Sequence, residues 1–223
     1  TLSDDQHATK YFDFMLSNPP YGKSWKTDMD RLGGKGDISD TRFVVSHKDE
    51  PELKMIPRSS DGQLLFLANK ISKMKHNTEL GSRIVEVHNG SSLFTGDAGQ
   101  GESNLRRYII ENDWLEAIVA LPENMFYNTG IGTYIWFLDN NKPEHRRGKV
   151  QLINAADVED RRAGKEGFAV VNKRSLGNKR NDILPHHIDK VVKLYTAFEE
   201  NKFSKIFDND FFGFYSVTVD QPE

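Results

Sequence analysis

The sequence contains no cysteine, so disulfide bridges, cysteine nucleophiles and zinc sites built on cysteine are excluded. Long hydrophobic runs are missing as well, because no apolar stretch approaches the roughly 20 residues that a membrane-spanning helix needs. The adjacent histidines His186 and His187 lack a third partner at a metal-binding spacing, which favours a pair at a helix start. We therefore expect no metal, no membrane partner and a reducing compartment, the cytoplasm.

Positive charge is unevenly distributed along the chain. The 223 residues carry a formal net charge of −3, yet residues 142–180 contain 11 Lys or Arg against 5 Asp or Glu. A basic segment within an acidic chain can mark a surface that contacts nucleic acid. Arg146, Arg147 and Arg174 lie in this segment and are candidate contacts to DNA phosphates, although a charged loop is more often only a solvated surface.

Apolar residues recur with the periods of strands and helices in alternation. The pattern predicts strands at 11–17, 83–88, 115–121, 133–138 and 149–155, and helices at 64–74, from 102 onwards and at 185–200. Alternating strands and helices predict an α/β fold with a mostly parallel sheet. The last two strands have no helix between them, so we expect an antiparallel hairpin at the edge of the sheet.

Two other stretches bear on the organisation of the chain. Residues 22–61 are polar and show no clear period, which predicts a long loop that is functional or mobile. The stretch after residue 160 combines a basic loop, a helical pattern and a final alternating segment. We therefore expect one part at residues 1–160 and a second part at residues 161–223 that packs on it.

The tetrapeptide Asn18-Pro19-Pro20-Tyr21 follows directly on the first predicted strand, at the edge where open α/β sheets bind ligands. Two prolines stiffen the chain, and their carbonyl oxygens can accept hydrogen bonds. The Asn18 side chain offers another acceptor, and the Tyr21 ring offers a flat face for stacking. Two converging acceptors can bind both hydrogens of an amino group and direct its lone pair outward. The tetrapeptide therefore suits a planar amine, such as an adenine flipped out of DNA.

Three longer stretches extend this motif: FDFMLSNPPYGKSW, DGQLLFLANKISKMK and ENDWLEAIVALPENMFYNTGIGTYIWFLDNNK. Together they resemble the modification (M) subunit of type I restriction–modification systems, an N6-adenine DNA methyltransferase that uses S-adenosylmethionine. The resemblance covers most of residues 10–155 and, more loosely, the helix at 185–200. It implies the later part of a Rossmann-like class I methyltransferase sheet, mostly parallel with an antiparallel edge hairpin.

The resemblance also implies roles for individual residues. Asn18 and the Pro19 carbonyl would hold the adenine amino group, Pro20 would stiffen the loop and Tyr21 would stack on the base. Asn18 would also be the contact to S-adenosylmethionine. The segment 122–130 would line the base pocket, where Phe126 and Tyr127 could stack against nucleotides or instead fill the core. DNA, a specificity subunit and a restriction subunit are the implied partners.

The family pattern also places a glycine-rich cofactor loop before the tetrapeptide, whereas residues 1–17 contain no glycine. We therefore expect a fragment that lacks the N-terminal cofactor-binding part, binds S-adenosylmethionine poorly and is inactive alone. A sheet without its first strands would expose an edge, which could support a homodimer. Two other functions stay open: methylation of a protein glutamine amide, which is also a planar amine, and a non-catalytic fragment that binds DNA or partners.

Overall fold

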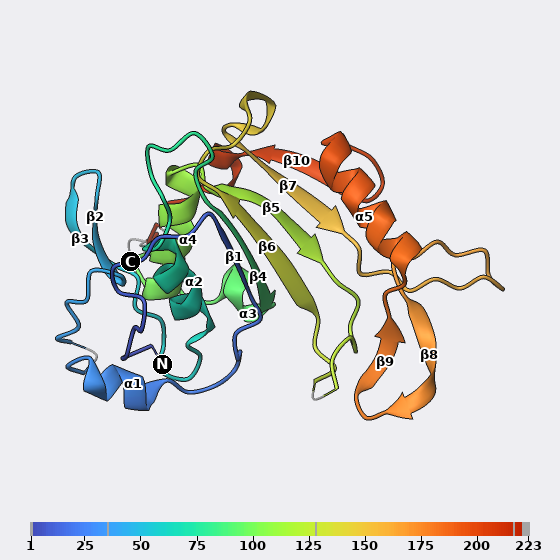
Figure 1. Cartoon of the computed structure of the whole chain (residues 1–223), viewed down its shortest axis with the longest axis horizontal. Helices are drawn as coiled ribbons and strands as arrows, with labels where there is room; N and C mark the ends of the chain where they lie inside the picture. The colour runs from blue at the N-terminus through green and yellow to red at the C-terminus, as the bar shows by residue number, and fades with distance from the viewer. Residues whose placement is uncertain (1, 35, 128, 216, 220–223) are drawn as a thin grey trace.

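A six-stranded mixed sheet forms the centre of the computed structural model, which describes residues 2–34, 36–127, 129–215 and 217–219 (Figure 1). The strands lie in the order β1 (Phe14–Ser17), β4 (Arg83–Asn89), β6 (Thr133–Asp139), β5 (Leu115–Ala120), β7 (Lys149–Asn154) and β10 (Ser204–Asp208). β1 pairs in parallel with β4, and β5 with β7, so these four strands share one direction. β6 and β10 run the opposite way. The predicted α/β class, with a mostly parallel sheet and antiparallel strands, is confirmed.

The predicted edge hairpin is wrong in its placement. β6 pairs with β4 on one side and with β5 on the other, so it lies inside the sheet. β7 follows β6 in the chain but lies beyond β5, and the antiparallel strand at that edge is β10. The chain between β6 and β7, with the 3-10 helix η1 (Glu144–Arg146), therefore crosses over the end of β5. Hydrophobic period predicts strands, but it does not encode the order in which they pair.

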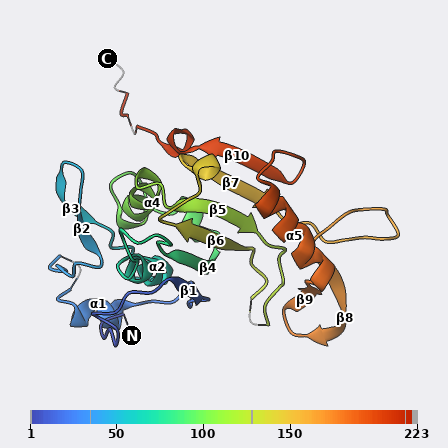
Figure 2. The ribbon, with the colours of Figure 1, turned by 45° about the horizontal axis from the view of Figure 1, so that its top comes forward.

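Helices cover both faces of the sheet, as Figures 1 and 2 show. α2 (Gln63–Ile71) and α4 (Gly101–Glu111) pack on one face, where Leu65, Leu67 and Ile109 meet Ile84 and Trp136 in the larger core. α5 (Pro185–Ala197) covers the other face over β5 and β7, where Val191 and Leu194 meet Val119 and Ile153. The short helix α3 (Ser91–Phe94) follows β4. Among the described residues, no helix is long and apolar enough to span a lipid bilayer.

Residues 22–61 are not the loose loop that their composition predicts. They form α1 (Lys26–Arg31) and a separate hairpin of β2 (Val44–His47) and β3 (Glu50–Lys54). Trp25, Phe43 and Met55 are buried in the larger core, with 4%, 0% and 1% of their surface exposed. Large apolar side chains at irregular spacing therefore anchor a segment whose polar composition resembles a loop.

The region after residue 160 joins the same architecture. β8 (Val170–Leu176) and β9 (Lys179–Asp182) form a hairpin beside the carboxyl ends of the main strands (Figure 1). β10 completes the main sheet next to β7, and the 3-10 helix η2 (Asn209–Phe212) follows it. The predicted second part, residues 161–223, thus supplies one strand to the sheet of the first, and a boundary near residue 160 stays a prediction.

Candidate functional site

The tetrapeptide Asn18–Tyr21 lies at the carboxyl end of β1, which ends at Ser17. Asn18 is exposed, and within the described part of the chain neither its side chain nor the Pro19 carbonyl oxygen makes a hydrogen bond. Pro19 itself is buried, which holds the turn against the body of the protein. Two acceptors on adjacent residues therefore remain available at a rigid corner, and they can receive the two hydrogens of an amino group.

Tyr21 ends the tetrapeptide and is half-buried. Burial raises the pKa of its phenol, so the ring stays uncharged at neutral pH. Gly22 follows at a φ of +65°, a conformation that favours glycine. Its N–H donates to Asp61 Oδ1 at 3.0 Å, which fixes the chain directly after Tyr21. An aromatic face therefore stands beside the two free acceptors on a turn that is tied down at its far end.

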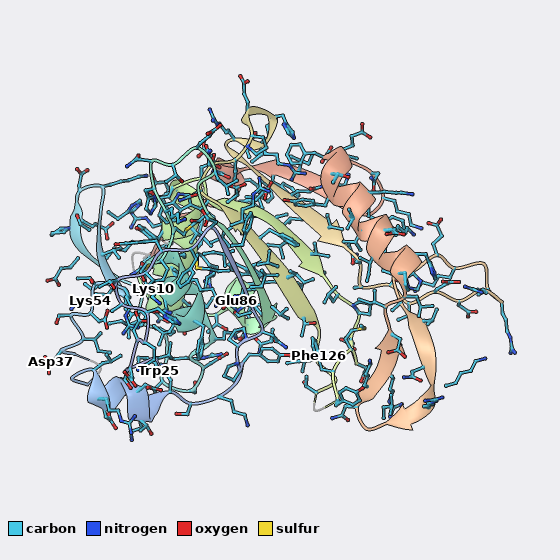
Figure 3. The ribbon with its side chains drawn as sticks, in the orientation of Figure 1. Lys10, Trp25, Asp37, Lys54, Glu86 and Phe126 are labelled. Atoms are coloured by element: carbon cyan, nitrogen blue, oxygen red, sulfur yellow. The ribbon has the colours of Figure 1, made fainter. Side chains whose placement is uncertain are left out.

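Phe126 and Tyr127 lie in the loop after β5, and Figure 3 labels Phe126 there. Because β5 runs in the same direction as β1, this loop is at the same edge of the sheet as the tetrapeptide. Phe126 is half-buried and Tyr127 is 60% exposed. The Asn124 carbonyl accepts the N–H groups of Arg180 and Asn181, at 2.9 and 3.2 Å, so this loop is joined to the β8–β9 hairpin. Residue 128, part of the predicted segment 122–130, lies outside the described residues.

The three candidate arginines are separated by the fold. Arg174 is exposed on β8, at the edge that carries the tetrapeptide. Arg146 and Arg147 lie in the crossover after β6, and because β6 runs antiparallel this crossover is at the opposite edge. Arg146 is also only 4% exposed and bonds the Tyr195 carbonyl oxygen. Burial therefore contradicts the predicted DNA contact of Arg146, whereas the DNA contact of exposed Arg147 stays a prediction.

A buried polar network behind the tetrapeptide was missed by sequence reasoning. Ser17 Oγ donates to Glu86 Oε2 at 2.9 Å, and Lys70 on α2 forms an ion pair with the same oxygen. His88 lies two residues further along β4 and contacts Gln63, which in turn donates to Asp61 at 2.7 Å. Alternation along RIVEVHN places Glu86 and His88 on the same face as buried Ile84. Two titratable side chains at core positions of a strand were the signal that could have revealed them.

Burial controls the charge of this network. Glu86 and His88 are fully buried, and desolvation raises the pKa of Glu86 although Lys70 acts against the shift. Desolvation and the charge of Lys70 lower the pKa of His88 to about 3. His88 is therefore neutral at physiological pH.

Glu159, His186 and His187 also lie together, at the start of α5. The Leu184 N–H donates to His187 Nδ1 at 3.1 Å, so the neutral ring carries its proton on Nε2. That nitrogen lies 3.1 Å from Glu159 Oε2, and Arg161 bonds the same carboxylate. Hydrogen bonds from Arg161 and His187 lower the pKa of Glu159 to about 2. These contacts describe an ion-paired helix start, and the protonated Nε2 does not offer a lone pair to a metal.

Comparison with known proteins gives consistent matches along most of the chain. A family model described as N-6 DNA Methylase matches residues 1–211. The methylase subunit of the type I restriction enzyme MjaIX of Methanocaldococcus jannaschii is 28% identical over 199 residues, 89% of this chain and 30% of that protein. The MjaVIII methylase subunit of the same organism is 30% identical over 163 residues, 72% of this chain and 26% of that protein.

A solved structure extends the likeness to the fold. The crystal structure of a type I restriction–modification system methyltransferase subunit from Streptococcus thermophilus superposes with a TM-score of 0.66 at 22% identity. The match covers 94% of this chain and 37% of that one. The chain thus spans 30% and 26% of the lengths of the two curated relatives.

Proposed function

The chain belongs to the N-6 DNA methylase family, and from this premise we propose that it supplies the base-binding corner of a site-specific DNA adenine N6-methyltransferase. The observation that carries the proposal is the pair of free acceptors, the Asn18 side-chain oxygen and the Pro19 carbonyl, at the carboxyl end of β1. An exocyclic amino group of a flipped adenine presents two hydrogens to such a pair. The half-buried Tyr21 ring beside them supplies a stacking face.

The chemistry follows from this arrangement. S-adenosylmethionine supplies an electrophilic methyl group when bound, and Asn18 is the residue of this chain that would lie next to it. With both N6 hydrogens held by the Asn18 side-chain oxygen and the Pro19 carbonyl, the N6 lone pair would point outward and could take up the methyl group that S-adenosylmethionine would supply, with the thioether as leaving group. One N6 proton then leaves to solvent. The protein's contribution is positioning and electrostatics, without a covalent enzyme intermediate.

DNA would approach from the edge that carries the tetrapeptide. Phe126 and Tyr127 stand on the neighbouring loop, and exposed Arg174 lies on the adjoining β8–β9 hairpin. We assign Phe126 and Tyr127 to contacts with the target nucleotide and Arg174 to a DNA phosphate. The curated relatives are methylase subunits of type I restriction enzymes, and we extend their context to this chain: assembly with a specificity subunit, which reads the DNA site, and a restriction subunit.

The test measures transfer of a labelled methyl group from S-adenosylmethionine, using methylase preparations that contain this chain. Duplex DNA is compared with DNA whose adenines are replaced, and with a protein acceptor that offers glutamine amides. We expect label only in adenine-containing DNA, at adenine N6. Asn18→Ala should lower kcat by about 100-fold or more, the cost of one well-placed hydrogen-bonding group in an active site.

Asn141→Ala is the matched control, because Asn141 is exposed at the opposite edge of the sheet. It should leave kcat within about twofold, as expected for a surface substitution. Label in glutamine would show that the substrate is protein and not DNA. DNA binding without label in any acceptor would identify a binding fragment and contradict the proposal.

A further inference from the structure

The tetrapeptide is held at both ends by side chains of one buried polar network. Ser17, directly before Asn18, donates to Glu86 Oε2 at 2.9 Å. Gly22, directly after Tyr21, donates to Asp61 Oδ1 at 3.0 Å. Figure 3 labels Glu86, which lies on β4. The two ends are connected through His88 and Gln63. Four side chains in contact with one another thus form a brace: Glu86 and His88 on β4, Gln63 at the start of α2, and Asp61 just before it.

The orientation of Gln63 follows from its partners. The Asn89 backbone N–H can only donate, and it points at Gln63 Oε1 at 3.1 Å, so that atom is the carbonyl oxygen. His88 Nδ1 lies 3.1 Å from the same oxygen. An oxygen without hydrogens must accept here, so His88 Nδ1 carries the proton. A neutral His88 ring then has a bare lone pair on Nε2.

That lone pair faces a carboxylate. His88 Nε2 lies 3.4 Å from Glu86 Oε1, and both side chains are fully buried. Neither atom has a hydrogen-bond partner within the described part of the chain. Two buried acceptors facing each other repel and lose their solvation without compensation. One proton placed between them changes the contact into a hydrogen bond.

We propose that Glu86 and His88 hold one proton between them and act as positioning residues that fix the two ends of the Asn18–Tyr21 tetrapeptide. This inference rests on the proposed function, because it takes the tetrapeptide as the group that holds the reacting amine. Neither side chain touches that amine. Their effect is transmitted through Ser17 on one side and through Gln63 and Asp61 on the other.

The charged groups around the pair agree with a single shared proton. Lys70 from α2 binds Glu86 Oε2, the oxygen that does not face His88. Asp61 lies beyond Gln63 and binds Gly22, and Trp136 from β6 contributes its ring edge-on to His88 at 5.2 Å. Burial raises the pKa of Glu86 and lowers that of His88 to about 3, which places the proton on the carboxyl group.

Two substitutions at Glu86 separate the parts of the proposal. Glu86→Gln keeps the shape and supplies an amide N–H to His88 Nε2, while its oxygen still accepts from Ser17 and Lys70. Glu86→Leu removes both connections. Glu116→Gln is the matched control, since Glu116 is another buried glutamate of the sheet, 5% exposed and remote from the tetrapeptide, and an amide oxygen can still accept from Tyr195.

In the labelled-methyl assay, Glu86→Leu should lower kcat by about 100-fold, the cost of a misplaced reacting group, and shift KM for DNA much less. Glu86→Gln should restore most of that loss. Ser17→Ala removes a single hydroxyl from a half-buried site and should lower kcat by roughly 5- to 30-fold. It tests the brace even where Glu86→Leu does not fold. Equal losses in Glu86→Gln and Glu86→Leu, or a comparable loss in Glu116→Gln, would overturn the proposal.

Two measurements do not depend on methyl transfer. Nitrogen-15 NMR of the unmodified chain should show His88 with its proton on Nδ1, and without the ordinary histidine titration between about pH 8 and about pH 5. Amide exchange at Gly22 should accelerate in Glu86→Leu and stay unchanged in Glu116→Gln. A proton on Nε2, or normal titration, contradicts the inference. An inactive wild-type preparation with the expected NMR result would instead contradict the proposed function alone.

Discussion

Glu86 and Glu116 are buried glutamates of the same sheet, and their carboxylates differ in how fully they are paired. Glu86 faces α2 and leaves one carboxylate oxygen with only His88 in front of it. Glu116 accepts from the Tyr195 hydroxyl at 2.7 Å and lies 3.4 Å from Arg146 Nε. The register of β5 shifts between Leu115 and Ala117, a bulge that lets Glu116 face α5.

The difference distinguishes the Glu116 group, which stabilises the fold, from the Glu86 group, which lies beside the candidate site. Arg146 is enclosed between the rings of Tyr195 and Phe198, 4.4 and 4.3 Å from their centroids, and bonds a carbonyl near the end of α5. A cation at a helix C-terminus stabilises the helix dipole. Every polar atom of this group is paired, so it fastens α5 to the sheet. The Glu86 network has unpaired atoms and ends at the residues that flank the tetrapeptide.

The largest effect on the free energy of unfolding should come from breaking the Glu116–Arg146 ion pair. Arg146→Met leaves Glu116 buried without its cation, and should lower the free energy of unfolding by about 3–5 kcal/mol in urea titration. Arg147→Met is the control, because Arg147 is exposed, and should change stability by no more than about 0.5 kcal/mol. Similar values for the two variants would show that the buried pair contributes no more than the surface does.

The next effect concerns pH and the proton on Glu86. A glutamate usually titrates near 4.5, and burial raises the pKa of Glu86 in the folded chain above this value. The native state then keeps a proton that the unfolded state loses, so this stabilisation is full below pH 4.5 and is lost as pH rises through the folded pKa. Glu86→Gln has no such loss, and its stability relative to wild type should increase with pH.

His88 behaves in the opposite sense. Its pKa falls from 6.5 to about 3, so its contribution is present above pH 6.5 and is lost as pH falls towards 3. Glu86→Gln keeps this loss of stability at acid pH, because His88 is unchanged. The difference in stability between wild type and Glu86→Gln therefore reports the titration of Glu86. Urea titrations at about pH 5 and about pH 9 measure the difference. If the stability of Glu86→Gln relative to wild type stayed constant or fell with pH, Glu86 would be an ionised carboxylate paired with Lys70.

The smallest effect is expected at Leu16, on the face that α5 covers only in part, and Ile153 on the same face provides the contrast. Leu16 on β1 is 77% exposed, whereas Ile153 on β7 is 1% exposed beneath α5. Leu16→Ala should change the free energy of unfolding by no more than about 0.5 kcal/mol. Ile153→Ala should lower it by about 2–5 kcal/mol. A large loss at Leu16, also measured by urea titration, would show that this end of the face is covered in solution.

Sequence reasoning located the regular elements well where apolar residues are periodic. The helix around Leu64 and Leu67 and the strands at 83–88 and 115–121 appear close to their predicted limits. It failed for residues 22–61, where Trp25 and Phe43 are buried at irregular spacing among polar neighbours. It also failed for Arg146, since a buried cation and a surface cation have the same sequence signature. Pairing order and burial depend on contacts distant in the chain, which periodicity does not report.

The site was predicted in one part and missed in another. The tetrapeptide has a local motif whose chemistry follows from four adjacent residues. The brace behind it joins Ser17, Glu86, Gln63 and Asp61, which are far apart in sequence and meet only because β1 pairs with β4 beneath α2. Such a network becomes visible only after strand order is known.

β1 has a neighbour on one side only, because β4 is its single partner in the described sheet. This four-residue strand leads directly into Asn18. A polypeptide that paired with its open side would restrict the same backbone that carries the base-binding acceptors. Assembly at that edge and capture of the target base would then be thermodynamically linked, and each would change the affinity of the other by the same factor.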